Sequence, residues 1–90
     1  MVFLNILIAE DENDIKSLLE INLEQDGYSV FTAKDGFESM VIMKKETIDI
    51  AILDVIMPRL DGFNLLRKIR ETSTIPVIFL TARGDDMDKI

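Results

Sequence analysis

Apolar and polar positions follow one another along this chain in blocks whose lengths and spacings predict strands and helices in alternation. Short, nearly continuous apolar runs have the length of strands, and the longer stretches between them carry apolar residues at helical spacing. The runs predicted to be strands are Phe3–Ala9, Tyr28–Ala33, Ile50–Leu53 and Val77–Leu80. The alternation predicts an α/β fold with a parallel sheet, right-handed crossovers and helices on both faces.

The first two predicted helices have recognisable boundaries. The first carries an apolar set at helical spacing and stops at Gly27. That set is Ile15, Leu18, Leu19 and Leu23. The second begins where Asp35 and Glu38 form a capping pair, and it runs through Lys45. We expect Phe37, Met40 and Val41 to face the core from it, together with Met43.

The third helix is predicted to begin near Asp61-Gly62 and to bury the stripe formed by Leu65, Leu66 and Ile69. Asp85, Asp86 and Asp88 resemble the acidic first turn of a further helix.

Two of the strands differ in how apolar they are. The 28–33 run is mixed, which predicts an edge strand. The 50–53 run is apolar at consecutive positions, as expected of a central parallel strand covered on both faces. Pro58 ends the loop after that strand, and Pro76 precedes the last one.

Composition limits the functions open to the chain. Its 90 residues fit one domain, residues 1–90. Seventeen acidic against ten basic residues give a net charge of -7, which argues against direct nucleic-acid binding by this segment. No apolar stretch approaches the ~20 residues that span a bilayer, and the apolar opening lacks the charged start and the length of a signal peptide, so no membrane association is expected.

The chain contains neither cysteine nor histidine. Disulfides, thiolate or imidazole metal sites and a histidine base are therefore excluded, and oxygen ligands remain. The composition suits a reducing compartment, so a cytoplasmic location is expected.

Three predicted strands lead into residues suited to a single site. Glu10-Asp11 follows the first, Asp54 the third and Thr81 the fourth. Parallel strands share their C-terminal edge, where open α/β sheets bind ligands. Carboxylates crowded there repel one another unless a cation intervenes, and oxygen ligands suit Mg²⁺, with Mn²⁺ as the alternative.

An aspartate beside such a cation is able to attack phosphorus and form an aspartyl phosphate. Asp54 is the predicted nucleophile because it leaves the most buried strand. Thr81 is placed to donate its hydroxyl to a phosphoryl oxygen.

Three sequence fragments carry a family resemblance: Ile-Leu-Ile-Ala-Glu-Asp-Glu, Ile-Leu-Asp-Val-Ile-Met-Pro-Arg-Leu-Asp-Gly and Phe-Leu-Thr-Ala. In this order and with these intervening helices, the chain resembles the receiver domain of two-component response regulators. The resemblance implies a flavodoxin-like (CheY-like) parallel sheet with strand order 2-1-3-4.

The same resemblance implies a role for each matching residue. Asp54 becomes the phospho-acceptor, Asp11 a direct Mg²⁺ ligand, Glu10 a ligand through water, the Ile56 backbone carbonyl a further ligand, and Thr81 the switch hydroxyl. It also implies a sensor histidine kinase as phosphoryl donor. Such a domain is not an enzyme acting on other substrates: it catalyses only its own phosphorylation and dephosphorylation.

The chain departs from the family pattern at its C-terminal end. It stops before the fifth strand, the last helices and the Lys-Pro pair of the family, so it resembles a truncated receiver. The fourth strand then becomes an exposed edge, and we expect a homodimer through it. A truncated receiver that acts only as a dimerisation or interaction module, without phosphotransfer, is the alternative function.

Other interpretations of these residues are weaker. A haloacid-dehalogenase phosphatase needs a second aspartate two residues after the nucleophile, where Ile56 stands. A flavodoxin-type nucleotide site needs a hydroxyl- or glycine-rich loop after the first strand, where acidic residues would repel phosphate. As structural residues only, Asp54 would cap a loop, Thr81 would extend a strand, and Glu10-Asp11 would favour a helix N-terminus.

Overall fold

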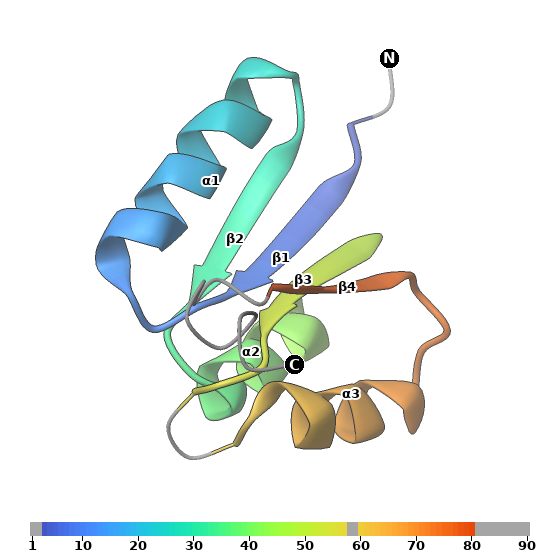
Figure 1. Ribbon diagram of the computed structural model, residues 1–90. Helices are drawn as coiled ribbons and strands as arrows, with labels where there is room; N and C mark the ends of the chain where they lie inside the picture. Colours follow the sequence, from blue (N-terminus) through green and yellow to red (C-terminus); the bar gives the residue numbers. More distant parts are fainter. Residues whose placement is uncertain (1–2, 58–59, 81–90) are drawn as a thin grey trace.

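The computed structural model describes residues 3–57 and 60–80, which form a parallel four-stranded sheet flanked by helices (Figure 1). The strands are β1 (Asn5–Ala9), β2 (Ser29–Ala33), β3 (Ile50–Asp54) and β4 (Val77–Leu80). Their order across the sheet is β2-β1-β3-β4, and every pair is parallel. The predicted fold and strand order are therefore confirmed, with β2 at an edge and β3 inside.

Helices cover both faces of the sheet, as the alternation of elements predicts. They are α1 (Asn13–Gln25), α2 (Gly36–Lys45) and α3 (Gly62–Arg70). Figure 1 shows α1 on one face, with α2 and α3 together on the other. Because all four strands are parallel, their C-terminal ends lie along one edge of the sheet.

The core forms two layers because successive strand residues point to opposite faces. Beneath α1, Ile6, Ile8 and Ile52 are buried, and the Leu19 and Leu23 side chains of the helix pack against them. The layer under α2 and α3 is built from nine buried residues. These are Leu7, Ala9, Ala33, Ile48, Ala51, Leu53, Met57, Leu65 and Ile69. Burial on both faces explains why β1 and β3 are apolar at consecutive positions.

Local signals set the ends of the helices much as predicted. The Asp35 side chain accepts a 2.7 Å hydrogen bond from the Glu38 backbone N–H, and Glu38 accepts one of 3.0 Å from the Lys34 N–H. Gly27 has a φ of 96°, a conformation that favours glycine, just past the end of α1. The predicted capping pair and helix stop are confirmed.

The prediction that Phe37 and Val41 face the core is wrong. Phe37 is 65% exposed and Val41 is 39% exposed, whereas Met40 and Met43 do pack against the core. The reason is that α2 turns its smallest side chains inward. A Cβ placed on Gly36 would collide with the Leu60 side chain, so the helix packs too closely there to admit a phenyl ring.

Several expectations fall outside the described residues. They concern Pro58, Thr81 and the acidic residues Asp85, Asp86 and Asp88. Within the part of the chain that is described, no helix has both the length and the apolar character needed to cross a bilayer.

Candidate metal and phosphoryl site

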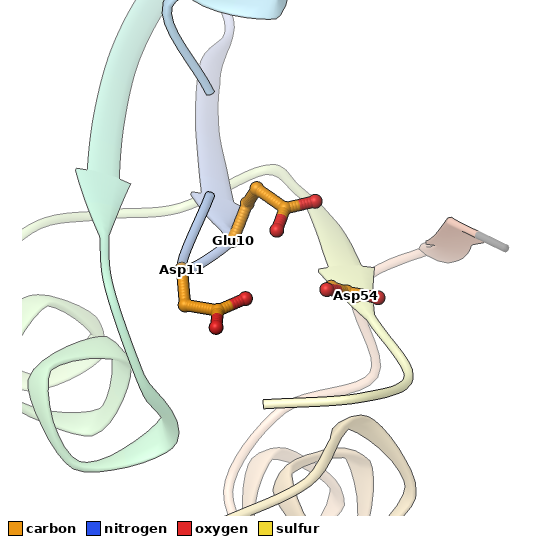
Figure 2. A group of neighbouring side chains, drawn as sticks. All are labelled: Glu10, Asp11 and Asp54. Carbon is orange, nitrogen blue, oxygen red and sulfur yellow. The ribbon is translucent and has the colours of Figure 1, made fainter. Parts of the chain in front are cut away.

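Three carboxyl groups meet at the C-terminal edge of the sheet. Glu10 and Asp11 directly follow β1, and Asp54 is the last residue of β3. The parallel register pairs Ala9 with Leu53, which places the next residues of both strands beside each other. One carboxylate oxygen from each residue lies within 4.8 Å of the other two, and Figure 2 shows the groups facing a common space.

Backbone N–H groups orient two of these carboxylates. The Glu12 N–H donates to Glu10 Oε2 at 3.0 Å, and the Ile56 N–H donates to Asp54 Oδ1 at 3.2 Å. Each donor lies two residues after its acceptor, in the turn that follows the strand. The local chain path therefore helps to hold the cluster in place before any ligand binds.

Glu10 occupies an unusual position for an acidic side chain. It is only 1% exposed, and its Oε1 atom is buried with no hydrogen-bond partner among the described residues. Burial raises the pKa of Glu10, the hydrogen bond from the Glu12 N–H lowers it, and the neighbouring Asp54 and Asp11 carboxyls raise it; together they bring this pKa to about 7. Such an unsatisfied buried oxygen costs free energy and points to an absent partner.

The donor set fits a hard divalent cation. All three residues offer carboxylate oxygens, and Asp11 is exposed while Glu10 and Asp54 are buried. Mg²⁺ binds in this way, through one or two carboxylates while keeping several waters. A cation here would relieve the repulsion among the carboxylates and satisfy the buried Oε1 of Glu10.

The start of α3 packs closely against the backbone of Asp54. A Cβ on Gly62 would lie 2.5 Å from the Asp54 carbonyl oxygen, so only glycine allows the helix to begin this near to β3. The Gly62 N–H also donates to the Val55 carbonyl at 3.0 Å. Sequence reasoning treated Asp61-Gly62 only as a helix start. The contact between Gly62 and Asp54 is not readable from their spacing.

The structure thus brings together Glu10, Asp11 and Asp54, the three acidic residues predicted for the site. Ile56 lies in the turn after β3, with its side chain 53% exposed, and the role of its carbonyl stays a prediction. Thr81 lies outside the described residues, although β4 ends at Leu80, the register partner of Asp54.

A parallel 2-1-3-4 sheet with an acidic cluster at its C-terminal edge defines a CheY-like α/β domain. The family description "Response regulator receiver domain" matches residues 6–90. The chain belongs to this family of signalling modules, and the resemblance seen in its sequence is confirmed.

Similar proteins agree with this assignment. The chain is 45% identical over 85 residues to the regulatory protein VanRc of Enterococcus gallinarum, covering 94% of this chain and 37% of that protein. It is 46% identical over 86 residues to the probable transcriptional regulator ycf27 of Cyanidium caldarium, covering 96% and 34%. The chain therefore spans about a third of the length of these curated relatives.

Among solved structures, the chemotaxis protein CheY4 of Vibrio cholerae superposes with a TM-score of 0.84 at 27% identity. The match covers 97% of this chain and 78% of that one. These similarities agree with membership of the response regulator receiver family.

Proposed function

We propose that this receiver accepts a phosphoryl group on Asp54 from the phosphohistidine of a sensor histidine kinase, with Mg²⁺ bound beside it. The observation that carries the proposal is the convergence of three carboxyl groups within 4.8 Å at the end of β1 and β3. Asp11 and Asp54 would hold the ion directly, the Ile56 carbonyl would complete the protein ligands, and Glu10 would bind through water.

The chain's own residues account for the transfer step. A carboxylate oxygen of Asp54 forms a bond to phosphorus as the phosphorus–nitrogen bond of the donor breaks, and the departing imidazole keeps the electron pair and takes a proton. The Ile56 N–H holds the Asp54 carboxylate in a fixed orientation for this attack. Bound Mg²⁺ would neutralise negative charge on the phosphoryl oxygens.

The remaining roles complete the proposal. Thr81 donates its hydroxyl to the transferred phosphoryl group and serves as the switch. The domain works in the cytoplasm, and in a transcriptional regulator any nucleic-acid contact is made by another part of the protein. A homodimer through the edge of β4 is included, because β4 is the outermost strand on its side of the described sheet.

Phosphoryl uptake tests the proposal directly. The chain is exposed to acetyl phosphate with Mg²⁺ and weighed intact. One added phosphoryl group is expected in wild type and none in Asp54→Asn, because the amide is not a nucleophile. Asp26→Asn is the matched control, since Asp26 is exposed at the end of α1 and outside the cluster.

Three further outcomes define the result. A chelator is expected to abolish labelling, and Asp11→Asn is expected to raise the Mg²⁺ concentration needed for half-maximal uptake. Label that persists in Asp54→Asn would assign the acceptor to another residue. A folded wild-type chain that takes up no label would favour the interaction module without phosphotransfer.

A further inference from the structure

A groove lies between α2 and α3, on residues that the phosphoryl site does not use. Its volume is about 560 Å³. Its apolar lining comes from Phe37, Met40 and Met43 of α2 and from Leu60, just before α3. Figure 1 shows the two helices on the same face of the sheet. Phe37, the largest of these side chains, is 65% exposed to solvent.

Basic residues from the last turns of both helices line this groove. Lys44 in the last turn of α2 and Lys68 in the last turn of α3 both line it, with Glu71 as the acidic lining residue. These two last turns hold five of the ten basic residues of a chain whose net charge is -7. The charged residues that line the groove itself, two lysines and one glutamate, give it a net positive charge on an otherwise acidic molecule.

We propose that this groove binds a single-chain amphiphile with an anionic headgroup, such as a medium-chain fatty acid. The alkyl chain lies along Phe37, Met40 and Met43, and the carboxylate lies between Lys44 and Lys68. Methionine side chains adapt to a flexible chain better than branched ones do. The exposed phenyl ring of Phe37 gains burial when the chain covers it.

Size favours a small ligand over a partner protein. Ligand pockets have volumes of roughly 300–1,000 Å³, which includes this groove. A stable protein interface buries roughly 800 Å² and about 20–30 residues on each side, far more than the groove offers. Apolar contact with a charged group at one end is the arrangement that recognises an amphiphile.

Titration of dodecanoate into the chain, below the concentration at which it forms micelles, tests the proposal by calorimetry and by backbone amide shifts. One molecule is expected to bind, with shifts at groove residues on α2 and α3. Affinity is expected to rise about fourfold per added methylene from octanoate upward, and to level off once the groove is filled.

Paired variants separate the two parts of the site. Phe37→Ala is expected to weaken binding about tenfold, because the ring that the alkyl chain would cover is removed. The ring is largely exposed, so its removal leaves the core of the protein intact. Phe3→Ala, at a similarly exposed phenylalanine outside the groove, is the control. Lys44→Gln with Lys68→Gln is expected to weaken binding about threefold to tenfold, and Lys45→Gln is expected to leave it unchanged.

Three results would overturn the proposal. The first is equal affinity for dodecyltrimethylammonium, which carries the opposite charge. The second is a set of amide shifts confined to the exposed apolar residues Leu18, Ile21 and Ile78. The third is binding of an acidic helical peptide in the groove when dodecanoate does not bind. The last result would make the groove a protein-docking surface. None of these readouts depends on phosphorylation of Asp54, so the two proposals fail separately.

Discussion

At the scale of single residues, Glu10 is an acidic side chain held in a buried position. It directly follows β1, of which Ile6 to Ala9 are buried, and one of its oxygens accepts a hydrogen bond from the Glu12 N–H while the other is buried without a partner among the described residues. Burial beside two other carboxyls raises its pKa to about 7 from an ordinary value of 4.5. The side chain is thus kept where ionisation is costly, which is the arrangement expected of a group that binds a cation.

This raised pKa predicts how stability depends on pH when no divalent cation is present. The folded chain binds the Glu10 proton more tightly than the unfolded chain does, so protonation of Glu10 stabilises the fold. This stabilisation is complete below about pH 4.5 and is lost as pH rises through about 7. The loss is on the order of 3 kcal/mol. Urea unfolding in the presence of a chelator should show that the free energy of unfolding of wild type falls as pH rises over this range. The fall should be smaller in Glu10→Gln.

Glu12→Gln serves as the control, because that exposed side chain lies outside the acidic cluster. It should keep the wild-type dependence on pH. Adding Mg²⁺ at pH 8 should raise the stability of wild type by mass action, because the proposed site exists only in the folded chain. Identical pH profiles for wild type and Glu10→Gln would contradict the cause assigned to the shift.

At the scale of elements, the N-terminus of α3 links the fold to the site. The helix begins at Gly62, which lies against the Asp54 carbonyl. Its N-cap residue, Asp61, accepts hydrogen bonds from the Asn64 backbone N–H at 2.9 Å and from the Asn64 side chain at 3.1 Å. The cap therefore stabilises the start of the helix that packs against the Asp54 backbone.

Removal of this cap has a measurable expected effect. Asp61→Ala should lower the free energy of unfolding by about 1 kcal/mol, because it leaves an N–H of the first turn without its acceptor. Glu12→Ala is the matched control, since Glu12 occupies the N-cap of α1 but makes no side-chain cap hydrogen bond. Denaturant unfolding measures the free energy of unfolding of both variants. An equal decrease in the two would contradict the capping role of Asp61.

At the scale of the whole molecule, β4 is an outer strand of the described sheet. The apolar residues Val77, Phe79 and Leu80 of β4 pack against the two core layers. Ile78, between them, is 54% exposed. An outer strand with an exposed apolar side chain favours pairing with another chain.

The proposed dimer is tested by light scattering on this chain at micromolar concentration. Wild type should have the mass of two chains, and Ile78→Lys should shift it to one, because a charge on an edge strand opposes pairing. Leu18→Lys, at an exposed leucine on α1, should leave the dimer intact. A stable wild-type monomer would contradict the proposal.

Much of this architecture was predictable because its signals are local. Apolar runs marked the four strands, and the Asp35 cap and Gly27 marked helix boundaries within a residue or two. The orientation of α2 was not predictable from its apolar residues. Phe37 is apolar yet exposed, because close packing of Gly36 against Leu60 decides which face of the helix turns inward.

The sequence by itself determined the alternation of strands and helices, and it placed acidic residues at the ends of β1 and β3. Those features depend on the chemistry of neighbouring residues. Only the tertiary structure decided that Glu10, Asp11 and Asp54 lie within 4.8 Å of one another and that Glu10 is buried. Convergence and burial arise from crossovers and packing between segments more than forty residues apart, which no local pattern records.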